Sequence, residues 1–238
     1  MRLDLALVAR GLARSRTHAS ALIADGHVRV NGAVASKPSA QVAPSDTLAA
    51  EADQWVSRAA HKLIGALDDS GLEVAGAVLD AGASTGGFTQ VCLERGADLV
   101  HAVDVGHGQL APLLRLDPRV RVHEGLNLRS LTLDHLGGEP VDLVVGDVSF
   151  ISLRLLLPTV LAVVRPSGHA MLLVKPQFEV GRELLGAGGV VHDDRLRLKA
   201  VDEVAEAAAE LGWFERWRGV SALPGSAGNV EYFLHLTR

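Results

Sequence analysis

The sequence is poor in several residue types and segments that would define a protein class. It contains one cysteine, Cys92, so no internal disulfide can form. The first ten residues include Asp4 and Arg10, which interrupt the apolar core that a secretory leader needs. Both features favour a reducing, cytoplasmic location.

Long apolar runs and metal-binding clusters are also lacking. The most apolar stretch, residues 155–164, contains Pro158 and lies between Arg154 and Arg165. It is too short for the roughly 20 residues of a membrane helix, so we expect a buried helix and no membrane role. No His and Cys residues show metal-ligand spacing, and we expect no metal site.

The length, composition and charge distribution of the chain predict two folded domains of different net charge. The 238 residues are 48% apolar and 21% charged, which is enough for one large and one small core. The net charge is −5, yet residues 1–45 hold six Arg or Lys against two Asp. The remaining residues hold 17 basic and 26 acidic side chains, so a basic segment is joined to an acidic body.

The basic segment has the pattern of a small α+β domain. Residues 3–11 and 15–25 are predicted helices, and residues 27–30 form a strand that enters an Asn31-Gly32 turn. A cationic surface of this kind suits the phosphates of folded RNA. The candidate RNA-binding residues here are Arg10, Arg14, Arg16 and Arg29.

We expect residues 1–53 to form the first domain, 54–57 a linker and 58–238 the second domain. Residues 57–67 are predicted to be an amphipathic helix on which Arg58 and Lys62, four residues apart, share a face. Arg58 is a further candidate for RNA binding.

Strands and helices alternate through the rest of the chain. The predicted elements are strands 78–81, 99–105, 120–123, 141–148 and 171–175, helices 153–164 and 194–211, and closing strands 214–223 and 229–236. The alternation predicts an α/β domain, a mostly parallel, seven-stranded Rossmann-like sheet with helices on both faces. The last strand follows a short Pro-Gly turn region, so we expect it to be antiparallel, as in methyltransferases.

The first of these strands ends in Asp80 and leads into a glycine-rich turn at Gly82 and Gly86, followed by a helix. This arrangement holds a nucleotide-like cofactor. A dinucleotide site would explain the acid Asp104 about twenty residues on, but the G-x-G-x-x-G spacing is absent.

The same turn formally matches the nucleophile elbow G-x-S-x-G of esterases, with Ser84 as nucleophile and His192 or His235 as base. No oxyanion-hole motif precedes it. The interpretation that we favour is an S-adenosylmethionine site, in which Asp80 orients the amino group and Asp104 takes the ribose hydroxyls.

Four polar residues elsewhere indicate the chemistry. Lys62 lies on the helix before the sheet, Asp147 and Lys175 lie at strand ends, and Glu231 begins the last strand. The carboxyl ends of parallel strands line the ligand crevice, so we expect these side chains to meet there. A free lysine amine is protonated at neutral pH, but burial and a second cation favour the neutral form. Lys175 is then the candidate general base for a sugar hydroxyl, with no metal required.

Lys62, Asp147, Lys175 and Glu231 resemble the K-D-K-E tetrad of FtsJ-type ribose 2′-O-methyltransferases. The surrounding sequence motifs resemble those of the TlyA (haemolysin A) family over essentially the whole chain. They are residues 56–58, 79–89, 103–106, 147–152, 174–181, 188–191 and 228–233. Residues 1–48 are similar to the RNA-binding domain named after ribosomal protein S-four.

The resemblance implies an rRNA (cytidine-2′-O)-methyltransferase that uses S-adenosylmethionine. The chain is similar to the shorter type of relative, which favours 23S rRNA alone, and 16S rRNA stays open as an additional target. It matches the family's asparagine after the third strand with Asn127, although Leu126 replaces the usual threonine. The candidate cofactor residues are Asp80, Gly82, Ser84, Gly86, Gly87, Phe88, Asp104, Asn127 and Asp147.

Two other function classes stay open at this point. The family name suggests a haemolysin, but no segment is suited to pore formation. A non-catalytic RNA-binding assembly factor would not need the four polar residues. An amino-methylating enzyme is disfavoured, since its D/N-P-P-aromatic motif is replaced by Asp147-Val148-Ser149-Phe150.

Overall fold

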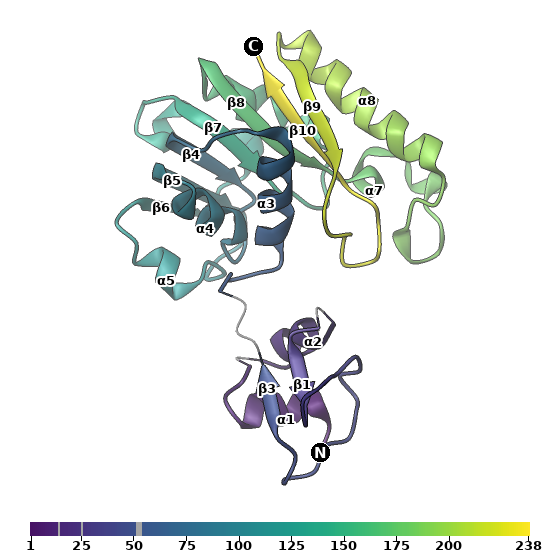
Figure 1. Ribbon diagram of the computed structural model, residues 1–238. Helices are drawn as coiled ribbons and strands as arrows, with labels where there is room; N and C mark the ends of the chain where they lie inside the picture. The colour runs from purple at the N-terminus through teal and green to yellow at the C-terminus, as the bar shows by residue number, and fades with distance from the viewer. Residues whose placement is uncertain (14, 25, 51–53) are drawn as a thin grey trace. The chain divides into compact units, whose positions relative to one another are not determined.

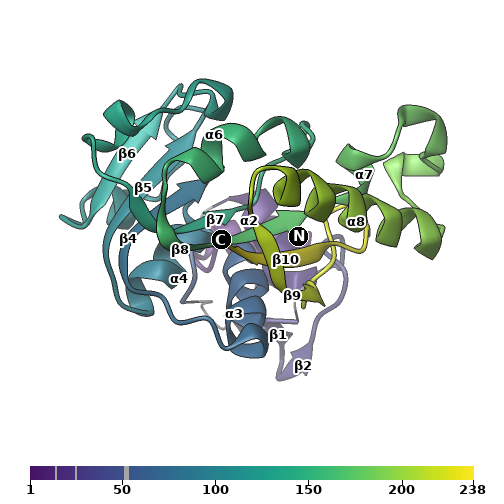
Figure 2. The ribbon, with the colours of Figure 1, turned by 90° about the horizontal axis from the view of Figure 1, so that it is seen from above.

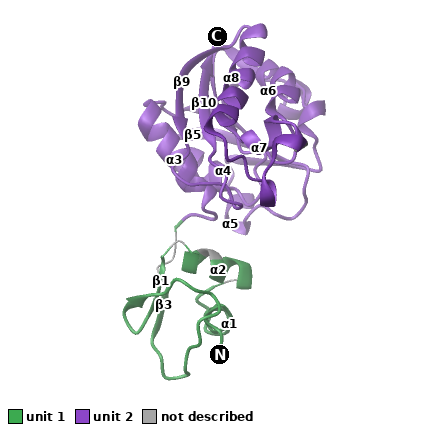
Figure 3. Ribbon diagram, turned by 90° about the vertical axis from the view of Figure 1, so that its right-hand side faces the viewer, with its two compact units in different colours: residues 1–54 green, residues 55–238 purple. Residues whose placement is uncertain are grey.

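The structure is a computed structural model that describes residues 1–13, 15–24, 26–50 and 54–238. The chain forms two compact units, residues 1–54 and 55–238 (Figure 3). One of the candidate RNA-binding residues, Arg14, lies outside the described residues.

The first unit packs two helices on a small antiparallel sheet of order β2-β1-β3. Its core contains Leu3, Leu7 and Ile23, all almost fully buried. Its elements are α1 (Leu3–Ala9), α2 (Arg16–Ala24), β1 (Val28–Val30), β2 (Ala33–Val34) and β3 (Leu48–Ala50).

Local sequence explains the ends of these elements. The Ser15 hydroxyl accepts a hydrogen bond from the N–H of His18 at 3.1 Å, as an N-cap residue does. Asn31 and Gly32 have φ values of 52° and 85°, which are those of the tight turn predicted between β1 and β2. β3 was not predicted, because its three residues lie in a segment rich in turn-forming residues.

The second unit contains a seven-stranded sheet of order β6-β5-β4-β7-β8-β10-β9. β10 runs antiparallel to β8 and β9, which confirms the expected methyltransferase-type sheet. The strands are β4 (Gly76–Ala81), β5 (Ala97–Asp104), β6 (Val120–Glu124), β7 (Val141–Gly146), β8 (Val164–Val174), β9 (Phe214–Val220) and β10 (Tyr232–Thr237).

Helices cover both faces of this sheet (Figures 1 and 2). Leu63 of α3 and Val91 of α4 lie in one core layer, and Val160 of α6 and Val201 of α8 lie in the other. The helices are α3 (Ala59–Ser70), α4 (Gly87–Glu94), α5 (Pro112–Arg115), α6 (Leu157–Ala162), α7 (Pro176–Glu179) and α8 (Asp194–Glu210), with 3-10 turns at Leu128–Ser130, Leu133–Leu136, Leu153–Leu155, Arg182–Leu184 and Ala187–Gly189.

The predicted helix over 153–164 is divided into a 3-10 turn and α6. Pro158 lies in the first turn of α6, where a missing N–H costs no hydrogen bond, and so it marks a helix start. β8 begins earlier than predicted, at Val164, because Val164 already pairs with Val141 of β7. An irregularity in register follows, and pairing resumes at His169. Gly168 lies in that irregularity, where a Cβ atom would come within 2.7 Å of the carbonyl oxygen of Asp142.

The segment that enters the second unit is packed against it. Val56 is buried in the same core layer as α3 and α4, and its N–H donates to Oε1 of Gln90 at 2.8 Å. The segment expected to be a linker therefore belongs to the second unit from Trp55 onward. No helix within the described ranges is long and apolar enough to cross a membrane.

Candidate active site

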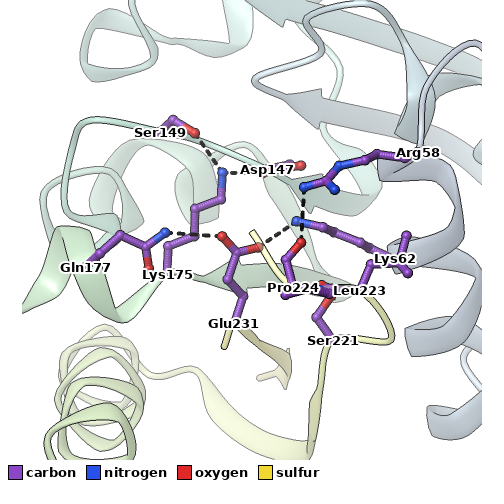
Figure 4. Close-up of polar contacts among 10 residues, drawn as sticks. All are labelled: Arg58, Lys62, Asp147, Ser149, Lys175, Gln177, Ser221, Leu223, Pro224 and Glu231. Carbon is purple, nitrogen blue, oxygen red and sulfur yellow. Dashed lines mark hydrogen bonds and ion pairs between the residues drawn. The ribbon is translucent and has the colours of Figure 1, made fainter. Parts of the chain in front are cut away.

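The four polar residues meet at one edge of the sheet as two ion pairs (Figure 4). Asp147 directly follows β7, and Lys175 directly follows β8 as the residue before α7. Nζ of Lys175 lies 2.6 Å from Oδ1 of Asp147. Nζ of Lys62, on α3, lies 2.6 Å from Oε2 of Glu231. Glu231 precedes β10 by one residue, a small correction to the predicted strand.

Three further polar contacts surround the two pairs. Nζ of Lys175 donates to the Ser149 hydroxyl at 2.7 Å. Nε2 of Gln177 donates to Oε1 of Glu231 at 3.2 Å, so both oxygens of that carboxylate have donors. Arg58 donates to the carbonyl oxygen of Pro224 at 3.1 Å.

The ion pairs line a cavity of about 430 Å³, which we call the catalytic cavity. Lys62 and Glu231 are buried, with 6% and 2% of their side chains exposed, whereas Asp147 is 18% exposed. The walls also contain Arg58, Ser149, Phe150, Gln177 and Phe178.

A second cavity of about 460 Å³ lies along the glycine-rich turn, and we call it the nucleoside cavity. Gly82 has a φ of 87°, and a Cβ atom there would lie 3.0 Å from the backbone oxygen of Asp147, so only glycine fits this approach. The predicted cofactor residues that line the cavity are Gly82, Ser84, Asp104, Asn127 and Asp147.

Asp104 at the end of β5 is held in place by the backbone. Its Oδ2 accepts the N–H of Ser84 at 2.9 Å, and its Oδ1 accepts the N–H of Gly106 at 2.7 Å. Each carboxylate oxygen has a second lone pair, so a fixed acid faces the cavity with capacity for two hydroxyl donors.

Gly87 and Phe88, at the start of α4, line a smaller cavity of about 270 Å³. Asp147 and Ser149 line all three cavities, and Phe150 lines both larger ones. The loop after β7 therefore separates the catalytic cavity from the nucleoside cavity.

Asp80 and Gly86 line none of these three cavities. Asp80 is fully buried behind the turn, where its Oδ2 accepts a hydrogen bond from the Thr89 hydroxyl at 2.6 Å and its Oδ1 has no partner among the described residues. Burial raises the pKa of Asp80 to about 7. Gly86 faces Leu110 and Leu114, whose side chains a Cβ atom would contact.

The Ser84 hydroxyl donates to Oε1 of Gln109 at 3.1 Å rather than to a histidine. His235, one of the two candidate bases of an esterase, pairs with His169 on the neighbouring strand, with 3.1 Å between the ring nitrogens. This arrangement favours a cofactor-binding turn over a nucleophile elbow.

The predicted RNA-binding arginines have different environments. Arg10 donates to the carbonyl oxygens of Ala43, Pro44 and Asp46 and so supports a turn. Arg16 forms a 3.2 Å ion pair with buried Asp4, with 60% of its side chain exposed.

The other two arginines lie on different units. Arg29 donates to the Gly32 carbonyl oxygen at 3.4 Å on the first unit. Arg58 is in the second unit and lines the catalytic cavity.

Sequence reasoning did not single out Ser149, Phe150, Gln177 or Glu179. Phe150 is 91% exposed with a φ of 67°, a left-handed conformation that is unusual for an aromatic residue. Its ring lies 5.3 Å from that of Phe178 at the catalytic cavity. The available signal was the proximity of these residues in the sequence to Asp147 and Lys175.

Comparisons with known proteins show the family to which the chain belongs. Residues 55–238 match the FtsJ-like methyltransferase family, and residues 1–48 match the S4 domain. The 16S/23S rRNA (cytidine-2′-O)-methyltransferase TlyA of Mycobacterium tuberculosis is 54% identical over 99% of this chain and 89% of its own length. The 23S rRNA (cytidine-2′-O)-methyltransferase TlyA of Campylobacter jejuni is 41% identical over 76% of this chain and 70% of its own.

A solved structure of a hemolysin-named protein from Streptococcus thermophilus is also similar. It is 37% identical, with a TM-score of 0.79 over 99% of this chain and 87% of its own. The likeness therefore covers both units as well as the sheet that carries the site.

Proposed function

Because this chain belongs to the FtsJ-like methyltransferase family and to its TlyA group, we propose that it methylates the ribose 2′-hydroxyl of a cytidine in ribosomal RNA, with S-adenosylmethionine as methyl donor. The observation that carries the proposal is the pair of ion pairs, Lys62–Glu231 and Lys175–Asp147, around one cavity beside the nucleoside cavity. Amino-group and acyl-transfer chemistry would not need two buried lysines at this position.

The residues of the nucleoside cavity fit the proposed cofactor. Asp104 is preset to accept two hydroxyl donors, as a ribose requires, and the absence of a side chain at Gly82 leaves room for a ligand against the backbone. The unpartnered Oδ1 of Asp80 is a buried acceptor behind the same turn. When bound, S-adenosylmethionine supplies an electrophilic methyl group on a sulfonium, whose carbon–sulfur bonding pair stays on sulfur as the methyl leaves.

We assign Lys175 as the general base. It accepts the proton that the ribose 2′-hydroxyl releases as its oxygen is methylated, a contribution of about 10²–10⁴-fold in comparable enzymes. Lys62 and Glu231 neutralise one another and keep the opposite wall of the cavity in place.

The S4 domain and the local charge of residues 1–45 support an RNA substrate. The two TlyA relatives are named for 23S rRNA, and the more similar of them also for 16S rRNA. We propose 23S rRNA as the principal target and 16S rRNA as a second one to be tested.

The test uses purified full-length protein, methyl-labelled S-adenosylmethionine, and both ribosomal subunits from cells that lack the gene. We expect label in the large subunit at a single cytidine 2′-oxygen, found by mapping 2′-O-methylated positions. Lys175→Ala should retain cofactor and RNA binding but lose methyl transfer, and the control Lys199→Ala, an exposed lysine on α8, should be active. Lysis of liposomes without label in rRNA would favour the haemolysin function instead.

A further inference from the structure

The amine of Lys175 has two oxygen neighbours. Oδ1 of Asp147 forms an ion pair with it at 2.6 Å. The Ser149 hydroxyl accepts a hydrogen bond from it at 2.7 Å. We propose that Ser149 is a positioning residue that directs the Lys175 amine toward the target hydroxyl, an inference that rests on the function proposed above.

The geometry of a tetrahedral nitrogen supports this role. The bond to Cε and the hydrogen bond to Ser149 fix two of its four directions, and the Asp147 carboxylate attracts a further N–H. In the neutral amine the lone pair then occupies the remaining direction. Lys175, Ser149 and Asp147 line the same two cavities, so substrate atoms in the catalytic cavity can approach that side of the amine.

Ser149 is itself held in place by its loop. The Glu179 carboxylate accepts the Ser152 hydroxyl at 2.5 Å and the N–H of Leu153 at 2.7 Å. Glu179 and Lys175 are four residues apart at the two ends of the α7 turn, so α7 is fastened to residues 147–153 at both ends (Figure 4 shows the Lys175 end). A hydroxyl on this loop can set the direction of an otherwise flexible lysine side chain before the substrate arrives.

The test compares Ser149→Ala with Ser149→Thr in the full-length protein. Ser149→Ala should lower kcat for rRNA methylation roughly tenfold, while KM for RNA and the Kd for S-adenosylmethionine change less than about twofold, because only orientation is lost. Ser149→Thr keeps the hydroxyl and should restore most of kcat. A loss confined to KM, an unchanged kcat in Ser149→Ala, or a threonine variant no better than alanine would overturn the inference.

Controls separate this inference from the proposed function. Ser167→Ala, at an exposed serine of β8 outside the three cavities, should have the kcat of the wild type. If wild-type protein methylates rRNA and Lys175→Ala does not, the proposed function stands whatever the Ser149 variants do. If wild-type protein does not methylate rRNA, the proposed function itself fails.

Discussion

At the residue scale, the site depends on charges that have been removed from water. The side chains of Lys62 and Glu231 are 6% and 2% exposed, and each is the other's ionic partner. Removing one member of such a pair leaves an uncompensated charge in a poorly hydrated place, which costs more than the pair itself contributes.

We therefore predict that Lys62→Met lowers the free energy of unfolding of the second unit by about 3–5 kcal/mol. Lys62→Met combined with Glu231→Gln should cost clearly less, because no charge then stays unpaired. Trp55, Trp213 and Trp217 all lie in the second unit, so tryptophan fluorescence in urea reports its unfolding. A double variant at least as unstable as the single one would contradict this account.

Asp80 should make stability depend on pH in the direction opposite to that of most carboxylates. Burial raises its pKa in the folded protein from 3.8 to about 7, so folding favours the protonated acid. The contribution of Asp80 to the free energy of unfolding is fully present below pH 4 and is lost as the pH rises through 7. Between pH 5 and pH 8 the loss amounts to about 2–3 kcal/mol. Asp80→Asn cannot ionise.

Urea unfolding at pH 5 and pH 8 checks this prediction. Between these two pH values, the wild type should lose about 2–3 kcal/mol more stability than Asp80→Asn. Equal losses in the two proteins would mean that Asp80 ionises normally in the folded state.

At the scale of elements, α7 and the loop after β7 act as one piece. The Glu179 carboxylate, 2% exposed, is the acceptor for the hydroxyl of Ser152 and the N–H of Leu153. Arg154 approaches Oε2 of the same carboxylate at 3.4 Å, so one acid serves three donors. These contacts of Glu179 hold the loop that carries Ser149 and Phe150, which line both of the larger cavities.

Glu179→Ala leaves a buried N–H without an acceptor, so it should lower the free energy of unfolding by about 1–3 kcal/mol, and Glu179→Gln should cost less. Glu203 pairs with the same arginine, Arg154, at 3.0 Å, but its side chain is 33% exposed. Glu203→Ala is therefore a matched control, expected to cost less than about 1 kcal/mol. Urea unfolding measures both, and similar costs for the two alanine variants would argue against the fastening.

Much of this layout could be predicted from the sequence, because alternating apolar strands and amphipathic helices specify a doubly covered sheet. The same rule placed Asp147 and Lys175 at neighbouring strand ends, and their meeting required only that the strands be parallel and adjacent. Glu231 was expected at the same edge because its strand was expected to be antiparallel, as β10 is.

Other features depend on tertiary contacts that no local pattern contains. β8 starts early because Val164 pairs with Val141 of β7, on the N-terminal side of the irregularity that contains Gly168. Phe150 has a left-handed φ within a loop whose far end is held by Glu179. Asp80 was expected to face the cofactor, but whether an acid at a strand end points into the crevice or behind the turn depends on side-chain packing.

At the scale of the whole molecule, the two units differ in net charge. Residues 1–45 carry six basic and two acidic side chains, whereas the rest of the chain is acidic in net charge. An acidic body gains little from the RNA backbone, so the first unit should supply most of the salt-dependent affinity. The second unit supplies the two cavities and the ion pairs.

The salt dependence of RNA binding tests this division. Arg29 lies on β1 of the first unit, where its guanidinium donates to the Gly32 carbonyl oxygen at 3.4 Å. If it contacts one phosphate, Arg29→Ala should reduce the slope of log K against log salt by about 0.7–0.9 and leave kcat at saturating RNA unchanged. Arg195→Ala, an exposed residue in the first turn of α8, is the control and should leave the slope as it is. A slope that changes with Arg195 and not with Arg29 would place the RNA contact on the second unit instead.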